Sequence, residues 1–248
     1  MSRIVLITGA SRGIGAATAR LAAARGFDVA INYQKDREAA QAVAQSVRDL
    51  DRKALVIRAD VAEEAQILEM FETIDRQLGT LNALVNNAGI LEPQCRVEDM
   101  TGERLQRVFA VNIHAVLLCC REAIRRMSTT RGGLGGAIVN VSSMAARLGS
   151  PNEYVDYAAS KGAVDSLTIG LSKELARDGI RVNAVRPGII ATDIHASGGE
   201  PDRIARIAPS VPLQRGGSPW EVAEAILWLL SDQASYSTGT FIDVSGGR

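Results

Sequence analysis

The segment EYVDYAASKGA, at residues 153–163, carries two tyrosines and one lysine within a predicted helix. Residues four apart lie on the same face of a helix, so Tyr157 stands beside Lys161, while Tyr154 has no such cation. A free phenol has a pKa near ~10, and a positive charge ~4 Å away could lower it by about three units. The Tyr157 phenol could therefore donate and accept a proton near neutral pH. Taken alone, the two residues could equally be ordinary surface of an amphipathic helix.

The use of lysine at this position is informative because the chain is rich in arginine. It has 24 arginines but only four lysines, Lys35, Lys53, Lys161 and Lys173. A compact ammonium fits between a phenol and a bound ligand more easily than the broad guanidinium fork of arginine. Lysine at 161 therefore favours a role in chemistry.

Composition excludes several classes of protein. The chain of 248 residues has a formal net charge of zero, which argues against a protein that binds the nucleic-acid backbone. It contains no apolar run of ~18 residues and no recognisable leader, so we predict a cytoplasmic protein. Its three cysteines and two histidines show no metal-ligand spacing, and no metal site is predicted.

Seven apolar, β-branched runs alternate with longer helical patterns. Because most of these runs are hydrophobic throughout, they indicate strands buried on both faces. The sequence predicts a single α/β domain, 1–248, with a Rossmann-like, doubly wound parallel sheet of about seven strands and helices on both faces. An irregular stretch at about 189–218 is predicted to form a substrate lid. The predicted strands are 3–8, 28–33, 54–60, 83–89, 137–143, 181–188 and 241–247, and the predicted helices are 13–25, 36–50, 63–78, 103–127, 154–177 and 219–231.

A glycine-rich turn, TGASRGIG at residues 8–15, joins the first strand to the first helix. Gly9, Gly13 and Gly15 allow a tight turn and close approach of the backbone to a ligand. The free N–H groups of the helix that follows could bind a pyrophosphate. This turn predicts a dinucleotide site.

The end of the second strand bears on which dinucleotide binds. An acidic residue there would receive the ribose hydroxyls of NAD, but the sequence has Asn32 and Tyr33 at that point. Arg12 and Lys35 lie close by, and two cations suit a 2′-phosphate. Although Asp36 is also near, the sequence favours NADP(H) over NAD(H).

Other strand ends carry polar residues that should meet at the same edge of the sheet. The fifth strand ends in VNVSS, which offers Ser142 or Ser143 to hold a substrate carbonyl. The fourth strand ends in NNAG, at 86–89, and the sixth in RPG, at 186–188.

Together these motifs resemble the short-chain dehydrogenase/reductase family, in particular its glucose-dehydrogenase-like and 3-oxoacyl-carrier-protein-reductase-like groups. The resemblance covers nearly the whole chain, including the closing segment TGTFIDVSGG. The motifs are TGxxxGxG, NNAG, Asn112 in VNI, a serine after the fifth strand, YxxxK, and Pro187–Gly188 followed by Thr192.

The resemblance implies a role for each matching residue. Tyr157 would be the general acid and base, and Lys161 would lower its pKa and bind the nicotinamide ribose. Ser143 would orient the carbonyl, and Asn112 would hold a water in a proton relay. With the positions singled out above, the predicted cofactor site comprises Gly9, Ser11, Arg12, Gly13, Ile14, Gly15, Tyr33, Lys35, Asp60, Val61, Asn87, Gly89, Tyr157, Lys161, Pro187, Gly188, Ile190 and Thr192.

The sequence thus predicts an oxidoreductase that moves a hydride between NADP(H) and a carbonyl or secondary alcohol of a small molecule. The family resemblance also implies a homotetramer, with no nucleic-acid or membrane partner expected. Alternatives are an idle NADP(H)-binding sensor or scaffold protein, and a sugar-nucleotide epimerase or dehydratase. Arg186, unusual before Pro187, could face solvent, pair with an acid or reach an anionic substrate.

Overall fold

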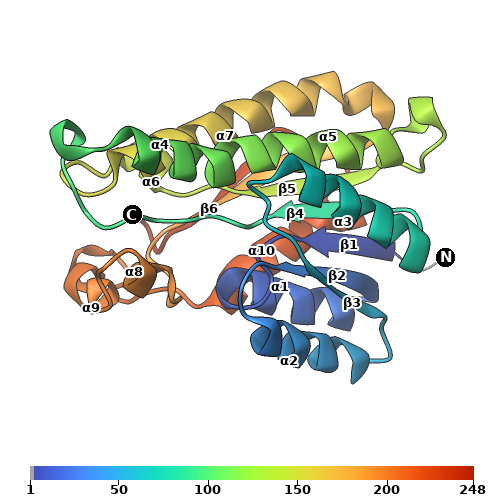
Figure 1. Ribbon diagram of the computed structural model, residues 1–248, viewed down its shortest axis with the longest axis horizontal. Coiled ribbons are helices and arrows are strands. Elements are labelled where there is room, and N and C mark those ends of the chain that lie inside the picture. Colours follow the sequence, from blue (N-terminus) through green and yellow to red (C-terminus); the bar gives the residue numbers. More distant parts are fainter. Residues whose placement is uncertain (1–2) are drawn as a thin grey trace.

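The computed structural model describes residues 3–248, which form one seven-stranded parallel sheet (Figure 1). The strand order is β3-β2-β1-β4-β5-β6-β7, which reverses direction between β1 and β4 as in a doubly wound sheet. All seven predicted strands are confirmed; six of them end earlier than predicted, and β2, β5 and β6 begin one residue earlier. They are β1 (Arg3–Ile7), β2 (Phe27–Tyr33), β3 (Ala54–Arg58), β4 (Ala83–Asn86), β5 (Gly136–Val141), β6 (Ile180–Pro187) and β7 (Phe241–Val244).

Helices cover both faces of the sheet (Figure 1). One layer holds α1 (Gly13–Ala24), α2 (Arg37–Arg48) and α10 (Pro219–Leu230). The opposite layer holds α3 (Glu64–Gln77), α5 (Ala115–Met127) and α7 (Val155–Glu174). In β1, Val5 and Ile7 pack into the first layer, while Ile4 and Leu6 pack into the second. Successive side chains of a strand point to opposite faces, which explains the continuous hydrophobic runs.

The helix expected at 103–127 is interrupted. It consists of α4 (Gly102–Phe109), a π-helical turn at Ala110–His114, and α5. The wider turn contains Asn112, one of the predicted catalytic residues. Such π-turns often occur at functional sites, and no residue pattern in the sequence marks this one.

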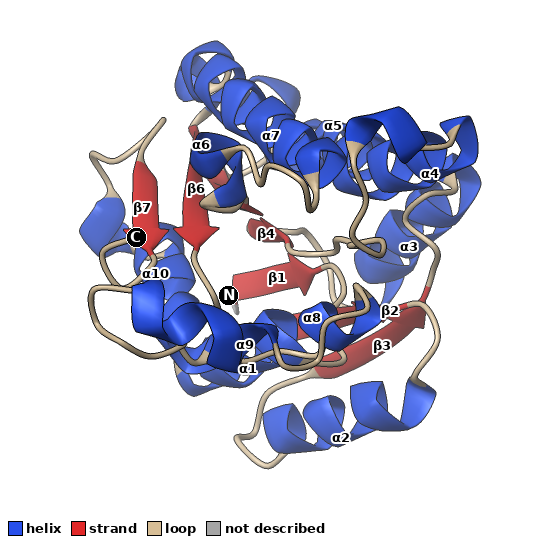
Figure 2. Cartoon of the chain, turned by 90° about the vertical axis from the view of Figure 1, so that its left-hand side faces the viewer, coloured by secondary structure: helices blue, strands red, loops and turns tan. Residues whose placement is uncertain are grey.

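The segment 189–218 lies beyond the carboxyl ends of the strands (Figure 1). It contains two short helices, α8 (Ile194–Ser197) and α9 (Arg203–Ile207). In Figure 2, α6 (Ala145–Leu148) lies above the ends of the central strands, and α8 lies below them. This segment therefore stands where a lid would stand. Over residues 3–248, no helix is both long and apolar enough to span a bilayer.

Candidate active site

A cavity of about 710 Å³ opens at the carboxyl ends of the strands. Its wall brings together segments that are far apart in the sequence, from the glycine turn to the 189–218 segment. Most of the predicted site residues line it: Gly9, Ser11, Arg12, Gly13, Ile14, Lys35, Asp60, Val61, Asn87, Gly89, Ser143, Tyr157, Lys161, Pro187, Gly188, Ile190 and Thr192. Gly15, Tyr33 and Asn112 lie behind the wall.

The glycine turn presents free backbone N–H groups to the cavity. Gly9 and Gly13 both have φ in the left-handed region, at 62° and 56°, which favours glycine. No side chain caps α1 at its first turn, and that turn has no acidic residue. A Cβ on Gly15 would sit 2.5 Å from the Gly9 carbonyl oxygen, so this glycine closes the turn and does not itself face the ligand. The uncapped helix start fits an anionic group such as a pyrophosphate.

Asn87 connects the end of β4 to this turn. Its Nδ2 donates to the carbonyl oxygens of Thr8, at 2.9 Å, and Gly9, at 3.0 Å. The Asn87 backbone N–H in turn donates to the Thr8 hydroxyl, at 3.0 Å. These bonds hold the glycine turn in position at the sheet edge.

Tyr33, predicted for the cofactor site, does not line the cavity. Every residue of β2 is buried, and Tyr33 packs in the core on the α1 side of the sheet. Gln34, the next residue, reaches the cavity wall. The alternation of side chains along a strand decides this difference. Asp36 also lines the cavity, but its carboxylate caps α2 by accepting from the Ala39 N–H at 2.9 Å.

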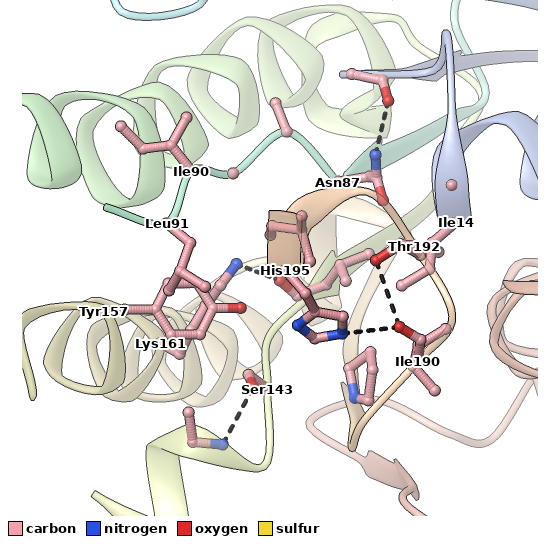
Figure 3. Close-up of a pocket in the computed structure, with 18 of the residues that line it drawn as sticks. Ile14, Asn87, Ile90, Leu91, Ser143, Tyr157, Lys161, Ile190, Thr192 and His195 are labelled. Atoms are coloured by element: carbon pink, nitrogen blue, oxygen red, sulfur yellow. Dashed lines mark hydrogen bonds between the residues drawn. The ribbon is translucent and has the colours of Figure 1, made fainter. Parts of the chain in front are cut away.

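Tyr157 and Tyr154 occupy different environments. Tyr157 lines the cavity with its hydroxyl directed into it (Figure 3). Tyr154 is 1% exposed, and its hydroxyl donates to the Gly198 carbonyl at 3.4 Å. The Arg203 guanidinium stacks on the Tyr154 ring, 4.8 Å from its centroid. Tyr154 therefore supports the 189–218 segment, whereas the Tyr157 hydroxyl lies at the cavity beside Ser143.

Lys161 is buried one helical turn after Tyr157. Its Nζ donates to the Val141 carbonyl oxygen at 2.8 Å and lies 5.6 Å from the centroid of the Tyr157 ring. A Cβ on Gly89 would come within 3.5 Å of Nζ, so glycine at that position leaves room beside the ammonium. The four-residue spacing thus brings the two side chains together as expected.

The proton affinities of this pair differ from the simplest expectation. Burial raises the pKa of Tyr157 above its usual value, while the Ser143 hydroxyl and the charge of Arg203 act to lower it. Burial lowers the pKa of Lys161 to about 8, opposed by the negative charge of Asp165. In the protein without ligand, burial is the largest influence on both groups, and the lowering of the phenol pKa by Lys161 stays a prediction for the complex with cofactor.

The two candidate serines, Ser142 and Ser143, lie in different environments. Ser142 is buried, and its hydroxyl donates to Asp165 at 2.6 Å. Ser143 lies at the cavity wall and interacts with Tyr157 (Figure 3). Of the two, Ser143 is the serine placed to reach a carbonyl bound beside Tyr157.

Arg186 forms ion pairs with acidic side chains and does not line the cavity. It forms ion pairs with Asp165 at 2.8 Å and with Asp243 at 3.5 Å, and stacks on the Phe241 ring at 3.9 Å. Of the three roles considered for Arg186, pairing with a nearby acid is the one observed. Asp165 therefore bonds to both Arg186 and Ser142, and it lies four residues after Lys161 on α7.

Asn112 is fully buried behind the cavity. Its Oδ1 accepts from the Ile90 N–H at 2.9 Å, and its Nδ2 donates to the Ile90 carbonyl and the Ser160 hydroxyl, both at 3.1 Å. With its amide bonded to the backbone N–H and carbonyl of Ile90, the side chain positions the segment after β4 that carries Ile90. The role of Asn112 in holding a water of the relay stays a prediction.

Arginines of the 189–218 segment are neutralised by carboxylates. Arg203 pairs with Glu153 at 2.6 Å and with Glu200 at 2.8 Å, and Arg206 contacts Glu153 at 2.8 Å. Arg215 pairs with Glu221 at 2.6 Å. This charge network ties α9 to the loop before α7.

Several cavity residues were not predicted from the sequence. His195, on α8, and Arg203 are both buried yet reach the wall. A lone histidine in an irregular stretch carries no sequence signal, because its neighbours in the cavity come from other parts of the chain. The residues missed in this way include Gln34, Ile90, Leu91, Tyr154, His195, Arg203 and Arg248.

The cavity therefore combines an uncapped helix start at one end with a phenol, a hydroxyl and a buried ammonium at the other. The first feature suits a dinucleotide pyrophosphate, and the second suits proton transfer to a carbonyl oxygen. Across the described part of the chain, no three His, Cys, Asp or Glu side chains gather as a metal ion would need. Fold and site together define a nicotinamide-dependent oxidoreductase.

Comparisons with known proteins agree. The family model described as enoyl-(acyl carrier protein) reductase matches residues 9–248. An uncharacterized oxidoreductase of Escherichia coli K12, YgfF, is 59% identical over 245 residues, covering 99% of both chains. The cis-4-hydroxycyclohexanecarboxylate dehydrogenase of Sinomonas cyclohexanicum is 40% identical, over 99% of this chain and 96% of its own.

A solved structure shows the same fold. The short-chain type dehydrogenase/reductase of Mycobacterium marinum superposes with a TM-score of 0.92 at 37% identity, over 99% of this chain and 94% of its own. The chain belongs to the short-chain dehydrogenase/reductase family. It is an NAD(P)-dependent oxidoreductase that acts on alcohol and carbonyl groups.

Proposed function

We propose that the protein is an NADP(H)-dependent oxidoreductase that interconverts a carbonyl and a secondary alcohol of a small molecule in the cytoplasm. The observation that carries the preference for NADP(H) is the charge around the end of β2. Arg12 and Lys35 line the cavity there, while the Asp36 carboxylate is engaged at the start of α2. Arg12, which also contacts Asp193 at 4.0 Å, and Lys35 bring two positive charges to this part of the wall, and two cations favour a 2′-phosphate over a bare ribose hydroxyl.

A nicotinamide bound in the cavity would supply the hydride for reduction of the carbonyl carbon. Tyr157 gives its phenolic proton to the carbonyl oxygen as negative charge develops there, and Ser143 donates a hydrogen bond to the same oxygen. The buried ammonium of Lys161 holds positive charge beside the phenolate that results. In oxidation, the same groups take the proton back in reverse.

The cofactor preference can be tested by removing each cation. Arg12→Ala and Lys35→Ala should each raise KM for NADPH by about tenfold, because a charge-assisted contact to phosphate is lost. KM for NADH should change less than about twofold. Arg37→Ala is the matched control, since Arg37 is exposed beside the site but does not line the cavity. Equal KM values of the wild type for NADPH and NADH would contradict the proposal.

The reaction itself is tested by following absorbance of NADPH and NADH with sugars, ketones and acyl thioesters. Steady oxidation of NADPH by one of these classes is expected. Tight binding of NADPH without turnover across the panel would favour a sensor or scaffold protein. Turnover of a sugar nucleotide without net loss of NADPH would point to an epimerase.

We also propose that the protein is a homotetramer that uses α5 and α7 as an interface. Leu117 on α5 and Ile169 on α7 are exposed, at 45% and 43%. Gly162 and Gly170 lie on α7 with no atom near the position of a Cβ, so packing within the chain does not account for them. A surface of glycines beside apolar side chains permits another helix to approach closely.

Ile169→Arg should therefore break the assembly, because it places a charge within an apolar contact. Light scattering after size exclusion should show a tetramer for the wild type and a smaller species for the variant. Leu134→Arg, at another exposed leucine outside both helices, should stay tetrameric. A monomeric wild type would contradict the proposed assembly.

A further inference from the structure

The His195 side chain has one nitrogen with a partner and one without. Its Nε2 lies 2.9 Å from the carbonyl oxygen of Ile190. A carbonyl oxygen only accepts, so Nε2 must carry the proton of this bond. Burial lowers the pKa of His195, opposed by its bond to Ile190, so the ring is neutral at pH 7. Nδ1 is then an acceptor with a free lone pair.

This Nδ1 is unusual in the molecule. His195 is 8% exposed, and Nδ1 is a buried side-chain nitrogen with no hydrogen-bond partner. Among residues 3–248, it is the one buried side-chain nitrogen or oxygen left in that condition. Buried polar atoms almost always have partners, and an exception calls for a ligand or another explanation. The same ring lines the cavity that holds Tyr157.

The orientation of the imidazole ring indicates where a hydrogen-bond donor to Nδ1 would lie. Figure 3 shows the imidazole between Ile190 and Tyr157, with Nε2 on the Ile190 side and the other nitrogen turned toward the phenol. Two other polar groups near the ring bond to partners elsewhere. Arg203, which acts on His195 through its charge, already bonds to Glu153 and Glu200. The Tyr154 hydroxyl donates to Gly198.

We propose that His195 is a specificity-determining residue whose Nδ1 accepts a hydrogen bond from a second hydroxyl group of the substrate, besides the reacting oxygen. The inference deepens the proposed function and rests on it. Nδ1 is covered in this structure, so the hydroxyl reaches it with a small shift of α8, a four-residue helix within the 189–218 segment. The new bond then satisfies the buried nitrogen and favours the closed position of that segment.

Two substitutions separate this role from a structural one. His195→Gln keeps a donor near the Nε2 position, for the bond to Ile190, but removes the acceptor at Nδ1. His195→Asn keeps an oxygen acceptor near the Nδ1 position but loses the bond to Ile190. A role in recognition predicts damage by Gln, and a role in anchoring α8 predicts damage by Asn.

The substrates form a matched series: cyclohexanone, its hydroxy derivatives at carbons 2, 3 and 4, and the corresponding methoxy compounds. The wild type should show a kcat/KM at least about tenfold higher for one hydroxyketone than for cyclohexanone and for its methoxy analogue. The methoxy oxygen has no proton to donate. This ratio should fall to within about twofold of one in His195→Gln and stay above about fivefold in His195→Asn.

Three results would overturn the inference: turnover of ketones with no preference for hydroxyl at any position, a preference that survives in His195→Gln, or equal loss in both variants. The first differs from a failure of the proposed function, in which no ketone is reduced at all.

A second measurement does not depend on turnover. Long-range ¹H–¹⁵N spectra of the NADPH complex should show His195 protonated at Nε2 only. Assignment is direct because His114 is the only other histidine and His195→Gln removes one set of signals. When the 2-, 3- and 4-hydroxycyclohexanols are added in turn, at least one should shift the Nδ1 resonance, and cyclohexanol should not. A proton on Nδ1, or an equal response to all four alcohols, would overturn the inference.

Discussion

Tyr157→Phe should lower kcat for carbonyl reduction by at least about 10³-fold, within the range attributed to general acid catalysis. The substitution removes one oxygen from the cavity wall and leaves the ring in place. Because burial raises the pKa of Tyr157, the wild-type phenol is protonated at pH 7 and ready to donate. Without it, the developing alkoxide has no proton source at that position. Steady-state kinetics at saturating NADPH measure the loss.

Binding of NADPH should persist in this variant, with a Kd within about threefold of the wild type by fluorescence titration. Tyr154→Phe is the matched control, three residues away on the same stretch of chain. Its hydroxyl makes only a 3.4 Å contact with the Gly198 carbonyl, so kcat should fall less than about fivefold. Activity of Tyr157→Phe within tenfold of the wild type would refute the assigned mechanism.

Lys161→Met should have two opposite effects, lower activity and higher stability. The activity should fall at least about 10²-fold, because the positive charge beside the phenolate is lost. The free energy of unfolding at pH 7 should rise by about 1–2 kcal/mol. Burial lowers the pKa of Lys161 to about 8, so keeping the ammonium charged in the fold costs stability. Losing the bond to the Val141 carbonyl offsets part of this gain.

The gain in stability should depend on pH, and the two pKa values of the lysine fix the direction of that dependence. The lysine pKa is about 8 in the fold and ~10.4 in the unfolded chain. The cost is fully present below pH 8, where both states are charged, and it disappears as the pH rises toward ~10.4. The stability difference between variant and wild type should therefore shrink over that window.

Urea unfolding at pH 7 and 9.5, at one protein concentration, measures this difference. Lys173→Met, an exposed lysine on the same helix, should change stability by less than about 0.5 kcal/mol. A Lys161→Met variant less stable than the wild type at pH 7 would show that the buried ammonium does not destabilise the fold.

The fold was predictable from the sequence because its signals are local and repeated. Seven apolar runs, with helical patterns between them, specify parallel strands buried on both faces. The spacing of Tyr157 and Lys161 is also local, because one helical turn fixes their separation. The glycine turn at 8–15 follows the same logic, since the positive φ values of Gly9 and Gly13 belong to the turn itself.

Side-chain orientation at the ends of elements was less predictable. Tyr33 and Gln34 are neighbours, yet one enters the core and the other the cavity wall. Their identities alone do not reveal at which residue β2 stops. The π-turn around Asn112 has the same origin, because a single widened turn leaves the helical pattern of the sequence unchanged.

What the sequence determined by itself was the order of strands and helices, the glycine-rich turn and the pairing of a phenol with an ammonium. All of these depend on residues close together in the chain. Only the tertiary structure decided that burial, more than charge, governs the proton affinities of that pair. Only the tertiary structure, too, placed Arg186 against Asp165 and His195 in the wall of the cavity. Desolvation and contacts between distant segments depend on the whole packed molecule, so no local pattern of residues carries them.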